Sequence, residues 1–262
     1  MNRRAMYTDV ITPNTAVPMV ERPRLGFLYP RGGSAFEYYH FAEYFNHNLL
    51  CYLIGGMHAY GGHKTHYPDP LYAIGSIENL SYPTRSMKPL RVNAAIWTTT
   101  SASFIGGMQW SKDQAAELAR ILGAPVSSTA LAYAAAIRAL DIRRVAVLAS
   151  YPAEVTEAFR GFLGEAGIAV GDTIHLDTER GEDAFDLEPD LLIEKALSMD
   201  CSDAQALLIP DTAMAAFEVM RRLEAELDLP VLTANQVTIW EAIRLAGARV
   251  RTADYGRLFA LT

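Results

Sequence analysis

The chain has 262 residues, of which 50% are hydrophobic and 20% are charged, and its formal net charge is −7. This composition is that of a soluble globular protein, and its acidic balance excludes the basic face of a nucleic-acid-binding protein. No apolar stretch approaches the ~20 residues that span a bilayer, so we expect no membrane contact. Cys51 and Cys201 have no nearby metal-ligand partner. We therefore expect no disulfide and no metal site, and a cytoplasmic location.

The amino-terminal segment, residues 1–23, has two arginines but lacks the apolar core of a signal peptide. We expect it to be an arm that lies on the protein surface or on another subunit of a homo-oligomer.

From residue 24 onward, short apolar segments alternate with helical ones. In chain order we predict a strand at 24–29, a helix ending near 46, strands at 49–56 and 91–97, helices at 111–123 and 128–140, a strand at 143–150, a helix at 152–167, a solvated connection at 180–190, a strand at 204–210, a helix at 213–227, a strand at 229–235 and a helix at 236–247. The strands are continuously apolar, which is typical of parallel strands covered on both faces. The pattern predicts a doubly wound α/β fold.

Hydroxyl, amide and glycine residues follow five of these strands, at 29–34, 97–103, 150–152, 210–212 and 233–236. Ligands of open α/β sheets bind at the carboxyl ends of the strands, so the five tails predict a single site. Three of the tails lead directly into predicted helices, whose first N–H groups and dipole attract anions. A small carboxylate suits such loops, although Ser, Thr and Asp are also common as ordinary helix N-caps.

These tails resemble the motifs of the aspartate/glutamate racemase superfamily, in particular its branch of maleate cis-trans isomerases and arylmalonate decarboxylase. The resemblance covers roughly residues 24–247. The matching positions are Pro30, Gly33 and Glu37, for a Pro, an Asn and a Glu after the first strand; 99–104, for the first catalytic loop, with Thr99 in the place of a cysteine; 149–151, for a Thr-Pro-Tyr motif; 210–212, for the second loop, with Asp211 in the place of the other cysteine; and Asn235 near the end.

The resemblance implies two similar α/β halves, with mainly parallel four-stranded sheets and the active site in the cleft between them. We accordingly expect an arm at 1–23, a first half formed by 24–122 plus 236–262, and a second half at 123–235. The resemblance also implies small carboxylic-acid substrates, no metal and no organic cofactor.

Both cysteines with which the family moves protons or attacks carbon are replaced here. Asp211 is the candidate acid or base, although an Asp at this position could instead cap the helix predicted from residue 213. Thr99 can hydrogen-bond a carboxylate or an enediolate but cannot carry a proton unaided. The candidate catalytic residues are Asp211, Thr99 and Tyr151, and the candidate substrate-binding residues are Gly32, Gly33, Thr100, Ser101, Ser150, Thr212, Asn235 and His63.

A glycine-rich segment at 55–70 has no counterpart among these motifs and contains His58, His63 and His66. His63 and His66 could bind a metal, or a histidine of the segment, with His63 as the candidate, or Lys64 could contact the substrate. We expect instead a lid over the cleft that binds no metal. The glycines and prolines of the segment argue against a helix there.

The expected function is a cofactor-independent lyase of the decarboxylase type, or an isomerase, acting on a small carboxylic acid. Racemisation by two bases needs a proton carrier on each face of the carbon, and isomerisation by cysteine addition needs a nucleophile. Since neither loop supplies them, decarboxylation is favoured. A hydrolase in which Asp211 activates water, and a relative that only binds carboxylates, remain open alternatives.

Overall fold

The computed structural model describes residues 10–30, 33–55 and 64–261. The strands are β1 Val10–Ile11, β2 Arg24–Leu28, β3 Leu50–Ile54, β4 Ala94–Trp97, β5 Val126–Ser128, β6 Arg144–Ala149, β7 Ala169–His175, β8 Ala206–Ile209, β9 Val231–Thr233 and β10 Arg249–Val250. The α-helices are α1 Phe36–Tyr44, α2 Pro68–Ile74, α3 Ile77–Ser86, α4 Ser101–Phe104, α5 Gly107–Leu122, α6 Thr129–Ala139, α7 Ala153–Glu165, α8 Gly181–Phe185, α9 Pro189–Leu197, α10 Phe217–Leu227, α11 Ala234–Leu245 and α12 Gly256–Leu261. Short 3₁₀ turns lie at Met19–Glu21 and Lys88–Leu90. No helix in the described part of the chain is long and apolar enough to cross a membrane.

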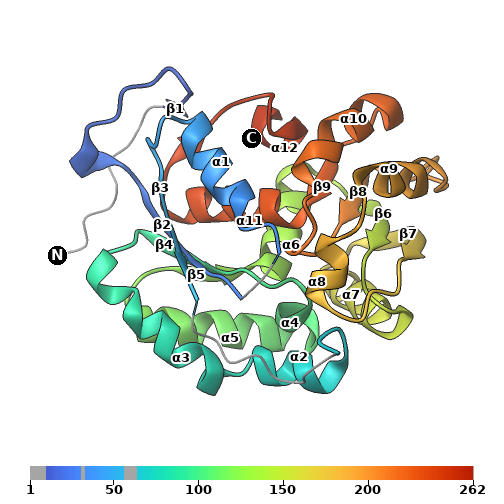
Figure 1. The fold of residues 1–262 in the computed structure, drawn as a ribbon, viewed down its shortest axis with the longest axis horizontal. Coiled ribbons are helices and arrows are strands. Elements are labelled where there is room, and N and C mark those ends of the chain that lie inside the picture. The colour runs from blue at the N-terminus through green and yellow to red at the C-terminus, as the bar shows by residue number, and fades with distance from the viewer. Residues whose placement is uncertain (1–9, 31–32, 56–63, 262) are drawn as a thin grey trace.

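Two four-stranded sheets form the frame of the molecule (Figure 1). Their strand orders are β3-β2-β4-β5 and β7-β6-β8-β9, and all neighbouring strands in them are parallel. If the strands of each sheet are numbered from 1 to 4 in chain order, both sheets have the same spatial order, 2-1-3-4. This repetition confirms the predicted fold of two similar halves with parallel sheets.

Helices cover both faces of each sheet, which explains the continuously apolar strands. In the first half, α1 and α11 lie on one face, and α3 and α5 lie on the other (Figure 1). In the second half, Val145 and Val147 of β6 pack in a core that includes residues of α6 and α7. Ala146 and Leu148 pack in a separate core with residues of α9 and α10. The residues from Val145 to Ala149 are buried on both faces of β6, so an apolar residue is favoured at each of these positions, whereas Arg144 at the start of the strand is partly exposed.

The division between the halves lies later in the chain than residue 123. β5 pairs with β4 and therefore belongs to the first sheet, so the expected boundary is wrong at this point. Gly123 has a φ of +81° and is the left-handed residue that ends α5. It marks the end of a helix within the first half, a common use of glycine. The last long helix, α11, packs against β4, β5 and α6.

The described part of the amino-terminal arm packs on its own chain. β1 pairs with β10 in a small parallel sheet, and Ile11 and Val17 are buried. Residues 10–23 are therefore held by contacts within the same chain.

Two segments expected to lack helices contain them. Residues 68–74 form α2 despite two prolines, because both lie in the first turn, where proline is tolerated. The acidic segment 180–190 contains α8 and the start of α9, whose first residue is Pro189.

Candidate active site

The strand tails of the two halves meet, as the hydrogen bonds between them show. Thr212, after β8, donates its hydroxyl to the carbonyl oxygen of Thr98, after β4, at 3.1 Å. Tyr133 on α6 donates its phenol to the carbonyl oxygen of Ile209, the last residue of β8, at 2.8 Å. Residues more than 70 positions apart in sequence are thus brought into one buried region.

Asp211 lies in this region with its side chain 6% exposed. Its Oδ2 accepts a hydrogen bond from the hydroxyl of Ser150 at 2.5 Å, and its Oδ1 accepts one from the backbone N–H of Ala213 at 2.9 Å. The alternative that Asp211 caps a helix from residue 213 is wrong, because α10 begins at Phe217 and its N-cap is Ala216. The carboxylate is instead held in place by two donors, one from each side.

Three hydroxyl groups at the ends of β4 and β6 are buried without a partner. Within the described residues, Thr99 Oγ1, Thr100 Oγ1 and the phenol of Tyr151 make no hydrogen bond. Buried hydroxyls are normally bonded, and leaving one unpaired costs about 1–3 kcal/mol. Each of these three hydroxyls can donate a hydrogen bond to a bound ligand, and the oxygens of a carboxylate are suitable acceptors. The hydroxyl cluster after β4 therefore has a chemical role that a simple turn would not need.

Tyr151 keeps its phenolic proton in this environment and can donate it in a hydrogen bond. Its side chain is fully buried, and burial, together with the charge of Asp211, raises the pKa of its phenol well above the ordinary value. The hydroxyls of Thr100 and Ser101 lie close enough to offset part of this rise. Neither of them completes a hydrogen bond with the phenol. Tyr151 thus stays protonated and available to a substrate oxygen.

Asn235, predicted to bind substrate, is occupied by contacts within the protein. Its Nδ2 donates to Ser34 Oγ at 2.9 Å, to Glu37 Oε2 at 2.7 Å and to the carbonyl oxygen of Thr212 at 3.2 Å, and its Oδ1 accepts from Tyr38 at 2.8 Å. Both ends of the amide bind protein groups in this geometry, and a contact of Asn235 with substrate stays a prediction. The hydroxyl of Thr212 is also engaged, with Thr98. Both residues hold the segment after β8 in place.

Gly33 serves a close approach between two backbone segments. Its φ is +76°, and a Cβ at this position would lie 2.7 Å from the Cα of Ala213. Next to it, Ser34 Oγ lies 2.8–3.2 Å from the carbonyl oxygens of residues 212, 213 and 214. The glycine therefore lets the loop after β2 meet the loop that carries Asp211, in place of the ligand contact expected from the sequence.

Gly33→Ala is expected to destabilise the protein by about 2–4 kcal/mol, because it adds a steric clash to the strain of a positive φ. Gly167→Ala is the matched control, since Gly167 has a φ of +78° and nothing lies within 4 Å of an added Cβ. That variant should lose about 1 kcal/mol. Urea unfolding of both variants measures the difference, and equal losses would show that the contact with Ala213 is unimportant.

Glu37 is a buried carboxyl group, 2% exposed, at the edge of this network. Its Oε1 accepts the backbone N–H of Phe217 at 2.8 Å, yet burial raises its pKa to about 8. The folded protein therefore binds a proton at Glu37 that the unfolded chain releases at lower pH.

Stability is accordingly expected to fall as the pH rises through the interval from about 4.5 to 8. A shift of this size corresponds to at most ~4–5 kcal/mol of unfolding free energy. Glu37→Gln mimics the protonated form and should remove most of this slope, whereas Glu157→Gln, a change at an exposed position, should keep it. Urea unfolding at several pH values tests this, and an unchanged slope in Glu37→Gln would contradict it.

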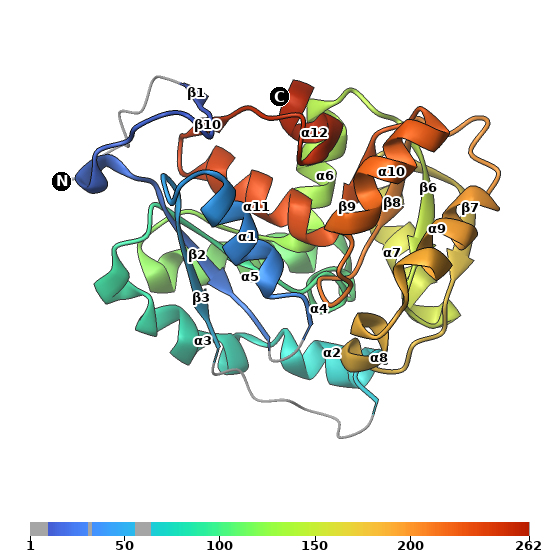
Figure 2. The ribbon, with the colours of Figure 1, turned by 45° about the horizontal axis from the view of Figure 1, so that its top comes forward.

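His66 joins the site, although nothing in the sequence distinguishes it from His63. Its Nε2 lies 3.7 Å from Asp211 Oδ2, and its ring is nearly perpendicular to that of Tyr151 at a centroid distance of 5.0 Å. The chain before α2 is fixed beside the chain before α8 (Figure 2), where the N–H groups of Thr65 and His66 both lie 3.0 Å from the carbonyl oxygen of Glu179. Only this tertiary contact distinguishes His66.

Two other predicted site residues, Gly32 and His63, lie outside the described residues, as does His58. No group of three or more His, Cys, Asp or Glu is placed to hold a metal ion in the ranges that the structure describes. A lid that binds no metal therefore stays a prediction for residues 56–63.

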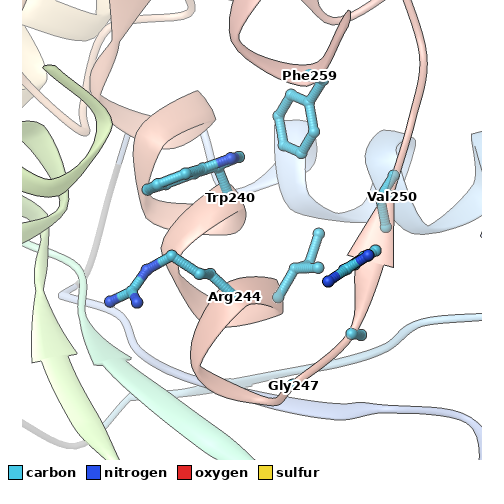
Figure 3. A pocket seen from close by; sticks show the side chains of 8 residues that line it. Trp240, Arg244, Gly247, Val250 and Phe259 are labelled. Carbon is cyan, nitrogen blue, oxygen red and sulfur yellow. The ribbon is translucent and has the colours of Figure 1, made fainter. Parts of the chain in front are cut away.

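A separate pocket of about 410 Å³ lies between α11, β10 and α12 (Figure 3). Trp240, Val250 and Phe259 contribute to its apolar lining. The side chain of Arg244 points away from Phe259 and Val250, and it forms an ion pair with Glu241 at 2.6 Å. None of the predicted site residues lines this pocket, so we do not place the chemistry there.

Comparison with known proteins agrees with this architecture. The family model described as arylmalonate decarboxylase matches residues 75–259. Arylmalonate decarboxylase of Bordetella bronchiseptica is 25% identical over 163 residues, which are 61% of this chain and 68% of that protein. Maleate isomerase of Geobacillus stearothermophilus is 27% identical over 138 residues, which are 52% of this chain and 55% of that protein.

Solved structures extend the similarity of the fold to nearly the whole chain. A mutant of the maleate cis-trans isomerase of Nocardia farcinica, with a covalently bound succinylcysteine intermediate, has a TM-score of 0.82 and 21% identity, and the match covers 92% of this chain and 99% of that one. A mutant of arylmalonate decarboxylase in the liganded form has a TM-score of 0.78 and 21% identity, with 92% and 100% covered. Since the family model matches well over half of the sequence, the chain belongs to the arylmalonate decarboxylase family.

Proposed function

We propose that this protein is a cofactor-independent lyase that decarboxylates a small dicarboxylic acid of the malonate type, in which two carboxylates share one carbon. The observation that carries this proposal is the set of buried, unpaired hydroxyls of Thr99, Thr100 and Tyr151 near the buried carboxylate of Asp211. Such donors bind an anion where water is excluded. The decarboxylase in the same family supports this choice of reaction.

In the proposed reaction, the three hydroxyls hold the carboxylate that stays on the substrate. The bond to the other carboxylate breaks and releases CO₂, and its electron pair moves into the retained carboxylate to form an enediolate. The negative charge on the retained oxygens grows in the transition state, so hydrogen bonds to them become stronger as the reaction proceeds. Donors that are already in position therefore lower the free-energy barrier to the loss of CO₂.

Asp211 then delivers a proton to the carbon that has lost CO₂. No second carrier of the family type faces it, because Thr99 occupies the place of the other cysteine and cannot transfer a proton unaided. The proton therefore arrives on one face of the enediolate. A prochiral substrate should give a product of one handedness.

Isomerisation by addition of a cysteine, suggested by the maleate isomerase relatives, lacks a nucleophile in this chain. Burial raises the pKa of the Cys51 thiol to about 12. Cys201 precedes β8 and so lies at the amino end of that strand, whereas Asp211 follows the carboxyl end. A thiolate is the form that attacks carbon, so neither cysteine suits this chemistry.

A two-stage screen tests the proposal. Thermal shift with malonate, phenylmalonate, methylmalonate, maleate and succinate identifies the acids that bind, since a ligand of the folded state raises its stability by mass action. Release of CO₂ is then measured on the acids that bind. Decarboxylation of a malonate supports the proposal. Conversion of maleate without loss of CO₂, or binding without turnover, would each contradict it.

A further inference from the structure

The ring of His66 is held in one orientation by Thr178. His66 Nδ1 lies 3.1 Å from the carbonyl oxygen of Thr178 and 3.2 Å from its Oγ1. The single hydroxyl proton of Thr178 is directed at the carbonyl oxygen of Ser150, at 3.0 Å. Both oxygens of Thr178 can therefore only accept a hydrogen from Nδ1, which places that hydrogen on Nδ1.

With Nδ1 committed to Thr178, only Nε2 can gain or lose a proton. Nε2 faces Asp211 Oδ2 at 3.7 Å, and the side chains of both residues are 6% exposed. A lone pair on Nε2 would repel the carboxylate, whereas a proton there is attracted to it, and this attraction is strong where water is excluded. The geometry thus favours a proton between these two atoms.

Several charged and titratable groups around the pair have partners of their own or keep their own protons. Tyr151 packs against His66 with the two rings nearly perpendicular, and it keeps its own proton, since burial raises its pKa. Lys64 and Glu179 form an exposed ion pair with each other at 2.5 Å. Asp183 is paired with Arg180, also at 2.5 Å.

We propose that His66 is the proton reservoir of Asp211: it stores a proton on Nε2 and passes it to Oδ2 when the carbon of the substrate becomes negative. This inference rests on the proposed function for the fate of the proton. His66 acts through Asp211 and is a positioning and proton-supplying residue, because nothing places it against the substrate itself.

The proton balance of the cycle is closed. The bond to the departing carboxylate breaks, CO₂ leaves, and the electron pair remains on the substrate as an enediolate. The Nε2 proton of His66 passes to Asp211 Oδ2 and from there to the carbon, and His66 then takes a proton from solvent. One proton is consumed for each CO₂ released. The gap of 3.7 Å must shorten for the transfer, as is common when a ligand-free site binds its substrate.

His175 offers a matched comparison within the same chain. Its Nε2 lies 3.8 Å from Asp177 Oδ2, almost the distance of the buried pair, but these side chains are 43% and 66% exposed. The two pairs therefore have nearly the same separation but differ strongly in burial. They also differ in that the Nδ1 of His66 is held by Thr178.

Nitrogen-15 NMR of the histidine rings tests, without any substrate, which ring nitrogen of His66 carries the hydrogen. We expect the neutral form of His66, observed at alkaline pH, to carry its hydrogen on Nδ1, whereas His175 should show the Nε2–H form that predominates in water. His66→Gln assigns the signal; if that variant does not fold, replacing the other five histidines one at a time assigns it. An Nε2–H form of His66 would overturn the inference.

Turnover gives a second, separate readout. His66→Ala is expected to slow the reaction by ~10²–10⁴-fold, the range for loss of a proton carrier. Free imidazole, which fits the space left by the side chain, should restore part of the rate, and His175→Ala should match the unmodified protein. A slow variant that imidazole does not rescue would indicate a structural role and overturn the inference. If NMR places the hydrogen of His66 on Nδ1 but no acid is turned over, the proposed function is wrong, while the arrangement of His66 beside Asp211 is still supported.

Discussion

Asp211→Asn is expected to reduce turnover by ~10²–10⁴-fold without disturbing the fold, because the amide keeps the shape of the side chain but cannot carry the proton. Its oxygen can still accept the N–H of Ala213, and its NH₂ group can donate to Ser150, so the local contacts survive. The rate on the acid found by thermal shift and the melting temperature of the ligand-free variant measure the two effects separately.

The pH–rate profile separates this role from anion binding. Asp211→Asn should lose the limb that the carboxylate sets, whereas Thr99→Val, which removes only a donor to the substrate, should keep it. Asp177→Asn changes an exposed carboxylate beside a histidine and should leave rate and profile unchanged. If Asp211→Asn kept both its rate and its full pH dependence, the proton carrier would have to be His66 or Tyr151 acting alone.

The parallel sheets could be predicted because burial on both faces leaves a direct trace in the sequence. β2, β4, β6 and β8 are short apolar runs with turn residues after them, and each was located to within a few residues. β7 was not predicted because it is an edge strand that is half-exposed and is interrupted by glycine and aspartate. β5 was not predicted because only one of its three residues, Val126, is apolar, and this omission displaced the boundary between the halves.

It was easier to predict which residues lie in the site than to predict what each side chain contacts there. Strand tails of parallel sheets converge by topology, so Asp211, Ser150 and Tyr151 could be grouped before any coordinates were known. Whether a polar side chain faces a ligand or another loop depends on partners far away in the sequence. Asn235 is the clearest case, since its amide is bound by residues around 200 positions earlier. His66 could not be singled out from the other histidines of 55–70 for the same reason, since its partners Tyr151, Thr178 and Asp211 follow β6, β7 and β8.

The unpaired hydroxyls lead to a prediction in which stability and activity change in opposite directions. Tyr151→Phe removes a buried donor that has no partner in the ligand-free protein, so we expect the variant to be more stable, by up to ~1–3 kcal/mol. The same change removes a donor to the retained carboxylate and should lower the rate by ~10²–10³-fold. Such an opposition is typical of groups that are kept for a ligand at a cost to the free protein.

Tyr133→Phe is the matched control for this experiment. Tyr133 is also fully buried, but its phenol is bonded to the carbonyl oxygens of Ile209 at 2.8 Å and Leu232 at 3.3 Å. Removing that hydroxyl should therefore destabilise the protein by about 0.5–1.5 kcal/mol, the usual value of such a bond. Urea unfolding of both variants without ligand compares them directly. A loss of stability in Tyr151→Phe as large as that in Tyr133→Phe would mean that its phenol already has a partner, and the hydroxyls at the strand ends would no longer indicate a site for a carboxylate.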